Sequence, residues 1–194
     1  MDADTELMVR ASRGDSDAFA ELARRHQGWL TRLFYHLLWD RDEAEDACQE
    51  VLVKVWLARE RYEPRAKFTT FLFAIARNHW AHRAERWANR PPVVSLHDQL
   101  GPEAREVLDR LVSEAATPEQ ELLRGYERFR IRRAIDELPE AQRIALVLAH
   151  FEGMSYAQIA ELVGAPEGTI KSRMWHAYRT LREKLVQSEE ADGR

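Results

Sequence analysis

The chain has 194 residues, of which 45% are hydrophobic and 32% are charged, and its formal net charge is −4. These values are typical of a globular chain with one large or two small domains, and they exclude a disordered or fibrous protein. The single cysteine, Cys48, excludes an intrachain disulfide and a cysteine-built zinc site. The N-terminus MDADTE is acidic and no run of about 18–20 apolar residues follows, so we expect a cytoplasmic chain without a signal peptide or membrane insertion.

The charges are segregated along the chain. Residues 40–50 contain six acidic side chains and one arginine, a net charge of −5. Residues 65–90 contain six basic side chains and one acidic side chain, a net charge of +5, and residues 167–184 contain five basic and two acidic ones, a net charge of +3. The pattern suggests a protein that meets both DNA and a basic protein surface.

Apolar residues recur at helical spacing along most of the chain, without the alternation of β-strands, so the fold is predicted to be all-α. The first domain, residues 1–90, is predicted to hold four helices, because acidic or serine caps and the breakers Gly14 and Pro64 divide it. These helices are expected to run from Thr5 to Arg13, from Asp15 or Ser16 past Leu37, from Asp40 or Asp42 to before Pro64, and from about Lys67 to Ala88.

Residues 91–118 are predicted to be a flexible linker, because they are acidic and contain four prolines. The second domain, residues 119–194, is also predicted to be helical. Thr117-Pro118-Glu119-Gln120 combines a capping box with proline at the first helical position. Leu138-Pro139-Glu140 begins a further helix, which Gly153 ends.

Residues Ser155 to Leu185 match the pattern of a helix-turn-helix. Ser155 and Gln158 form a capping box for a short helix, the turn is Gly164-Ala165-Pro166, and a longer helix follows. The long helix has an apolar stripe at Ile170, Met174, Ala177, Leu181 and Leu185. Its other side is polar and basic, a pattern more often explained by solvation alone. Here the acidic residues Glu167 and Glu183 stand only at the two ends of that side, which favours DNA binding.

The motifs of this second domain resemble region 4 of extracytoplasmic-function (ECF) sigma factors, a group of the sigma-70 family. The matching segments are Leu138-Pro139, Phe151 to Tyr156, Ile159-Ala160 and Gly168 to Arg173. The resemblance implies that this domain reads the minus-thirty-five element of a promoter. The residues that would read it are Lys171, Ser172, Arg173, His176 and Arg179.

The acidic stretch DEAEDACQEVLVKVW, from Asp42 to Trp56, resembles region 2.2 of the same family. In a helix, residues at i, i+3, i+4 and i+7 share one face, so Asp46, Gln49, Glu50 and Val53 are expected to form one surface. The resemblance implies that these four residues and Trp56 bind core RNA polymerase on the β′ clamp. It also implies contact of the chain with the β flap of the polymerase.

The stretch from Tyr62 to Arg86 mixes cations with aromatic rings, which suits single-stranded nucleic acid, and it resembles regions 2.3 and 2.4 of the family. The resemblance implies contacts with the melted minus-ten element by Tyr62, Arg65, Lys67, Phe68, Arg77, Asn78, Trp80 and Arg83. Phe71, Leu72 and Ile75 are expected to be core. For Phe73 and Trp80, core packing and DNA contact remain equally open.

No enzymatic motif is present: there is no phosphate-cradling glycine loop, no zincin motif and no nucleophile elbow. His79 and His82 lie one turn apart, but no third ligand accompanies them, so neither a metal nor another cofactor is expected. The sequence therefore predicts a non-catalytic sigma factor that binds polymerase and promoter DNA and is held by an anti-sigma factor. The alternatives are a stand-alone helix-turn-helix regulator and a helical adaptor that binds only proteins.

Overall fold

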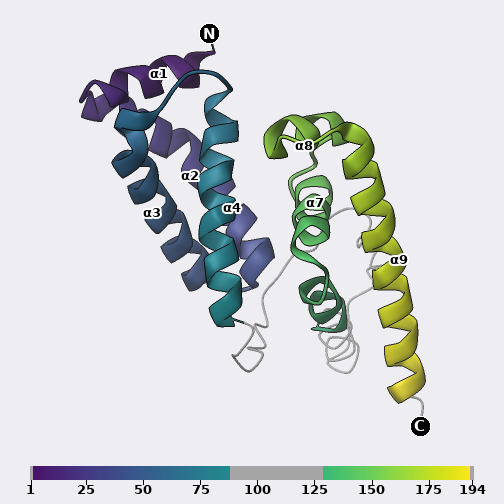
Figure 1. The fold of residues 1–194 in the computed structure, drawn as a ribbon. Helices are drawn as coiled ribbons and strands as arrows, with labels where there is room; N and C mark the ends of the chain where they lie inside the picture. Colours follow the sequence, from purple (N-terminus) through teal and green to yellow (C-terminus); the bar gives the residue numbers. More distant parts are fainter. Residues whose placement is uncertain (1, 88–128, 193–194) are drawn as a thin grey trace, which may run out of the picture. The chain divides into compact units, whose positions relative to one another are not determined.

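The computed structural model describes residues 2–87 and 129–192, and these ranges contain helices and no strand (Figure 1). Contacts between Cα atoms divide the chain into two compact units. We describe residues 2–87 as the N-terminal block and residues 129–192 as the C-terminal block. The all-α prediction is confirmed for the residues that are described. The predicted linker, 91–118, and the predicted helix start at Thr117 lie outside them.

The N-terminal block has four α-helices and one short 3-10 helix. They are α1 (Ala3–Ser12), α2 (Ser16–Leu38), α3 (Arg41–Ala58), η1 (Arg59–Arg61) and α4 (Phe68–Trp87). An aspartate caps each of the first three α-helices by accepting a hydrogen bond from a backbone N–H, with distances of 2.9 Å for Asp2, 2.9 Å for Asp15 and 3.0 Å for Asp40. These bonds satisfy donors that the first turn of a helix cannot pair internally. Of the alternatives in the sequence, Asp15 and Asp40 provide the caps.

The core of this block lies between α2 and α3, and α4 packs against α3. Its largest fully buried side chains include Phe34, Leu33, Leu22, Leu72 and Phe73. Helix α2 ends at Trp39, whose backbone is left-handed (φ 55°) and whose ring is almost entirely buried. The burial of this ring stabilises an otherwise unfavourable backbone conformation for a non-glycine residue. The turn places the acidic start of α3 directly after α2.

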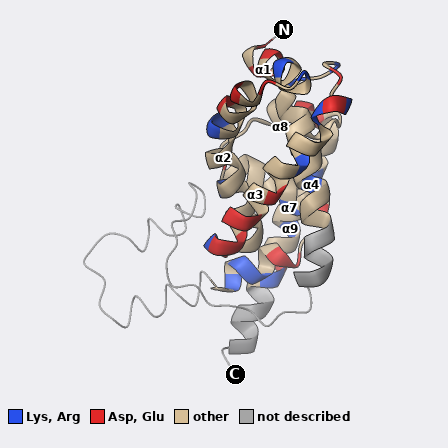
Figure 2. Cartoon of the chain, turned by 90° about the vertical axis from the view of Figure 1, so that its left-hand side faces the viewer, with Lys and Arg blue, Asp and Glu red and all other residues tan. Residues whose placement is uncertain are grey.

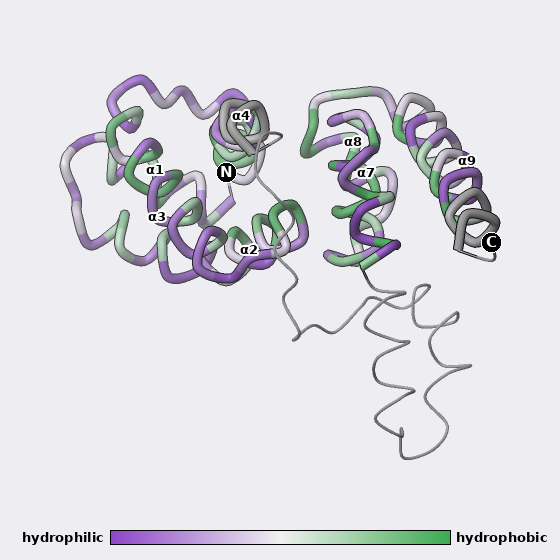
Figure 3. Tube along the Cα trace, turned by 90° about the horizontal axis from the view of Figure 1, so that it is seen from below, coloured by the Kyte–Doolittle hydropathy of each residue, from purple (hydrophilic) through white to green (hydrophobic). Residues whose placement is uncertain are grey.

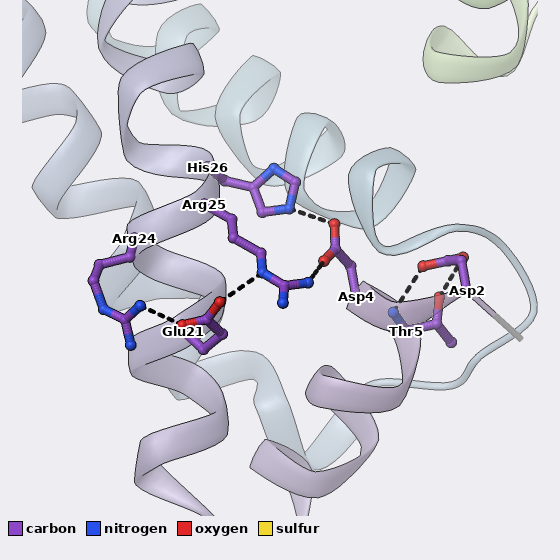
Figure 4. Close-up of polar contacts among 7 residues, drawn as sticks. All are labelled: Asp2, Asp4, Thr5, Glu21, Arg24, Arg25 and His26. Carbon is purple, nitrogen blue, oxygen red and sulfur yellow. Dashed lines mark hydrogen bonds and ion pairs between the residues drawn. The ribbon is translucent and has the colours of Figure 1, made fainter.

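A polar network joins α1 to α2 (Figure 4). Asp4 of α1 lies 2.7 Å from Nε2 of His26 and accepts a hydrogen bond of 2.9 Å from Arg25. Glu21 binds Arg25 in turn, at 2.8 Å, and also contacts Arg24. The exposed ion pairs add little to stability individually, but together they link α1 to α2.

The C-terminal block begins with helical residues 129–136 and continues with α7 (Glu140–His150), α8 (Tyr156–Val163) and α9 (Glu167–Asp192). Hydrophobic and hydrophilic residues alternate along α7 and α9 (Figure 3), and these two helices pack together. Arg130 donates a hydrogen bond of 2.7 Å to the carbonyl oxygen of Leu185, and Lys184 forms an ion pair with Glu137. These contacts hold α9 against the start of the block, and the Lys184 ammonium lowers the pKa of Glu137.

Candidate protein and nucleic-acid interfaces

Helix α3 presents an acidic surface at its N-terminal half (Figure 2). Asp46, Gln49 and Glu50 are exposed, and the side chain of Val53 is 57% exposed. The buried side of the same helix consists of small and branched residues, namely Ala44, Ala47, Cys48, Val51 and Val55. The structure therefore brings the four predicted residues together on one outward face, which we call the α3 face.

Trp56 lies in a different environment from the rest of the predicted polymerase-binding set. Its ring packs against Phe19 of α2, with 5.0 Å between ring centroids, and the guanidinium carbon of Arg59 lies 4.0 Å above it. Trp56 thus anchors the end of α3 to α2. The neighbouring Leu57 is instead 71% exposed, and it continues the α3 face one turn beyond Val53. Leu57 was not among the predicted residues, although its position four residues after Val53 was a usable signal.

Three of the aromatic residues expected to contact melted DNA are buried. Tyr62 is 8% exposed, Phe68 is 1% exposed and Trp80 is 2% exposed. Tyr62 packs on Phe71, and Phe68 packs on His26, with centroid distances of 5.1 and 5.2 Å. These rings belong to the core in this conformation, and their contact with melted DNA stays a prediction. Phe73, the other ring whose role was open, is buried as well.

The polar members of the same set lie outside the core. Arg65 and Lys67 are exposed in the loop before α4, where Arg65 forms an ion pair of 2.6 Å with Glu63. Arg77 and Asn78 are exposed on α4. The side chain of Arg83 lies outside the described residues. The candidate surface for a separated strand is therefore cationic and polar, with its aromatic residues underneath.

The helix-turn-helix has the predicted construction. The backbone N–H of Ser155 donates to Oε1 of Gln158 at 2.8 Å, and the N–H of Gln158 lies 3.3 Å from the Ser155 hydroxyl oxygen. Gly164 has φ +68°, a left-handed conformation that favours glycine, and it ends α8. The N–H of Thr169 then donates a hydrogen bond of 2.9 Å to the carbonyl oxygen of Pro166, and this bond belongs to the start of α9.

Of the predicted DNA-reading residues, Ser172, His176 and Arg179 lie on the outward side of α9, away from its buried apolar stripe, and Lys171 and Arg173 flank them. Lys171, Ser172 and Arg179 are exposed, while Arg173 and His176 are partly buried. Lys171 forms an ion pair of 2.8 Å with Glu167, which raises the pKa of its ammonium. We call the surface formed by Lys171, Ser172, Arg173, Trp175, His176 and Arg179 the α9 face.

Trp175 was not among the predicted DNA-reading residues, yet it is 58% exposed in the middle of the α9 face. Its ring lies 4.8 Å from that of His176 and 5.0 Å from the guanidinium carbon of Arg179. The signal in the sequence was its spacing, because Trp175 follows Ser172 by three residues and precedes Arg179 by four.

Residues outside these two faces bear on the remaining expectations. Cys48 is buried, and desolvation raises the pKa of its thiol. Among the described residues, no three His, Cys, Asp or Glu side chains are grouped as a metal ion would require. None of the helices described is long and apolar enough to cross a membrane.

The comparisons with known proteins match both blocks. Residues 22–89 match the family model of sigma-70 region 2, and residues 128–181 match that of sigma-70 region 4. The chain is 31% identical to the RNA polymerase sigma-H factor of Pseudomonas aeruginosa, over 94% of this chain and 93% of that protein. It is 30% identical to the ECF RNA polymerase sigma-E factor of Escherichia coli strain K12, over 94% of both chains.

Two solved structures share the fold. CnrH in complex with the cytosolic domain of CnrY has a TM-score of 0.63 and 22% identity, covering 96% of this chain and 99% of that one. The sigma factor RpoE of Bartonella quintana, in complex with the anti-sigma factor NepR, has a TM-score of 0.57 and 23% identity, covering 87% and 96%. The helical blocks, the two matched regions and the relatives agree: the chain belongs to the sigma-70 family of RNA polymerase sigma factors, within its ECF group.

Proposed function

We propose that the α3 face, extended by Leu57, binds core RNA polymerase and that α4 and the α9 face bind the two promoter elements. The observation that carries the proposal is the composition of the α3 face. Asp46 and Glu50 stand next to Val53 and Leu57, which are the large hydrophobic side chains most exposed on this helix. Acidic groups give complementarity to a basic partner, and exposed apolar groups give it a contact to bury.

The minus-ten element is assigned to the polar surface of α4 and the loop before it. Arg65, Lys67 and Arg77 supply cations for phosphates, and Asn78 can donate to or accept from a base edge. Unpaired bases expose those edges only after the duplex separates. The rings of Phe68 and Trp80 are buried and support this surface from below.

The minus-thirty-five element is assigned to the α9 face. Lys171 lies one turn into α9, where its exposed ammonium suits a phosphate contact. Arg173, His176 and Arg179 follow along the helix at a spacing that reaches successive base pairs in a major groove. The β flap of the polymerase would contact the same C-terminal block.

Three further assignments complete the proposal. Residues 1–90 and 119–194 act as separate domains, joined by residues 91–118. The chain works in the cytoplasm without catalysis of its own and without a cofactor. An anti-sigma factor holds it inactive until a signal arrives, and RpoE of Bartonella quintana, which shares this fold, was solved with such a factor.

Charge reversal on the α3 face tests the proposal. Asp46→Arg combined with Glu50→Arg should abolish co-purification with core polymerase, because repulsion replaces attraction at a charged interface. Glu6→Arg combined with Asp17→Arg is the matched control, since both residues are exposed, lie on α1 and α2, and give the same charge change. Circular dichroism should show unchanged helix content in both. Co-purification of the α3 variant at wild-type yield contradicts the proposal.

A further inference from the structure

One buried histidine joins the proposed polymerase-binding helix to the proposed DNA-binding helix. His79 of α4 is 6% exposed. Its ring packs edge-on against Phe34 of α2, with 5.8 Å between centroids and an interplanar angle of 84°. Its Nδ1 atom lies 2.7 Å from Nζ of Lys54 and 3.7 Å from Oε2 of Glu50, both on α3. Three helices therefore meet at a single titratable ring.

The contact with Lys54 favours the neutral form of this ring. A lysine ammonium has three donors and no acceptor, so Nδ1 of His79 must accept the hydrogen bond. The ring is then neutral and carries its proton on Nε2. Protonation at Nδ1 would place a second positive charge 2.7 Å from the ammonium. The ring would release Lys54 and turn its new N–H to a carboxylate, and that of Glu50 is 3.7 Å away.

Two charged groups that face His79, Glu50 and Lys54, lie on the helix that carries the α3 face. Glu50 belongs to that face and its side chain is 56% exposed, while Lys54 lies one residue beyond Val53 and is also exposed. From α2 the ring meets the uncharged Phe34. The protonation state of one buried ring can therefore change the charge that α3 presents to a partner.

We propose that His79 is a proton-sensitive positioning residue, which holds Lys54 when it is neutral and Glu50 when it is charged. This inference rests on the proposed role of the α3 face. The neutral ring draws Lys54 toward α4 and leaves the Glu50 carboxylate at the surface that meets polymerase. The charged ring draws Glu50 inward and displaces Lys54 outward, which weakens attraction to a basic partner. Affinity for polymerase should fall as the pH drops through the range in which histidine takes up a proton.

The first measurement uses the full chain alone. Nitrogen NMR of the labelled imidazole rings, with His79 identified by its loss in His79→Asn, reports the tautomer directly. At about pH 8 we expect an unprotonated Nδ1 and a proton on Nε2. In Lys54→Met, the pH midpoint of ring protonation should move upward, because a neighbouring positive charge has been removed. A ring with its proton on Nδ1, or no movement in Lys54→Met, overturns the inference whether or not polymerase binds the α3 face.

The second measurement is the dissociation constant for core polymerase at about pH 8 and about pH 6. The amide oxygen of His79→Asn can accept from Lys54 but cannot be protonated, so this variant should bind like the wild type at the higher pH. Between the two pH values the wild type should lose about two- to fivefold more affinity than the variant. His26→Asn, which removes the histidine paired with Asp4, is the control and should keep the wild-type pH response.

The outcomes separate the inference from the function beneath it. Wild-type protein that fails to bind polymerase at the higher pH contradicts the proposed function. Normal binding there, with equal pH responses in the wild type and His79→Asn, overturns the role of His79 alone. A larger pH-dependent loss of affinity in the wild type than in His79→Asn supports both the proposed function and the role of His79.

Discussion

The guanidinium carbon of Arg179 lies 5.0 Å from the centroid of the Trp175 ring, on the outward side of α9. The indole is 58% exposed, and the ring of His176 lies against it. Packing within the protein does not account for so exposed a ring. A flat apolar surface beside a cation suits the thymine methyl and guanine acceptors that neighbouring base pairs display in a major groove.

Trp175→Ala is therefore expected to weaken binding to the preferred minus-thirty-five sequence by about 1 kcal/mol, the value of one lost methyl contact. Binding to unrelated duplex should change little, because the indole carries no charge for phosphates. Competition binding of polymerase holoenzyme to promoter duplexes with single-base changes measures both quantities. An equal loss on all duplexes would exclude a base contact by Trp175.

Arg173 and Lys171 should differ in what they recognise. Arg173→Ala is expected to reduce discrimination at one base pair by about 1–3 kcal/mol if the contact is bidentate. Lys171→Ala should weaken all sequences alike and lower the salt slope by about one unit. Titrations of single-base promoter variants at several salt concentrations separate the two effects.

Glu167→Gln provides the control for Lys171. The Glu167 carboxylate lies 2.8 Å from the Lys171 ammonium and must be exchanged for a phosphate when DNA binds. Removing its charge should raise affinity for every sequence. If Arg173→Ala and Lys171→Ala both lose affinity equally for all sequences, neither residue reads a base. Ser172, His176 and Arg179 then become the candidates for base contacts.

Leu57→Ser should weaken polymerase binding with little loss of stability, because the leucine is 71% exposed and loses only its contact with a partner. Val55→Ala, two residues earlier and fully buried, is the matched comparison. It should lower the free energy of unfolding by about 2 kcal/mol and leave affinity nearly unchanged in the folded protein. Denaturant unfolding and polymerase binding, measured on both, test the assignment. Wild-type affinity in Leu57→Ser would remove Leu57 from the α3 face.

Asn78→Ala should impair opening of the promoter far more than binding to duplex minus-thirty-five DNA. Asn78 is exposed on α4, and only a separated strand offers the base edge that its amide would read. Permanganate footprinting of promoter thymines measures the opening. Reactivity equal to that of the wild type would take Asn78 out of the proposed minus-ten site.

The starts and ends of the helices were predictable because their determinants are local. The caps at Asp15 and Asp40 and the Ser155–Gln158 box each depend on residues within one turn, and all three form as expected. The end of α9 was predicted at about Leu185, but the helix continues to Asp192. No breaker occurs in that interval before Gly193.

The environments of the aromatic residues near the candidate site depend on tertiary packing. Helix α4 carries large apolar residues on most of its sides, so its periodicity did not show that Trp80 and Phe73 are buried together. Trp56 and Leu57 are adjacent in sequence, and only the contact of Trp56 with Phe19 decides which of them remains exposed. Neither fact is encoded within a single turn of helix.

Run-off transcription from a library of promoter sequences, with purified core polymerase and the full chain, tests the central claim most directly. As a sigma factor, the chain should cause initiation on a subset of templates that share a minus-thirty-five and a minus-ten element. Core polymerase alone should give none of these transcripts. A stand-alone helix-turn-helix regulator would instead bind duplex DNA without polymerase and produce no promoter-specific RNA. Tight DNA binding by the chain alone, with no such transcripts when core polymerase is added, would contradict the account.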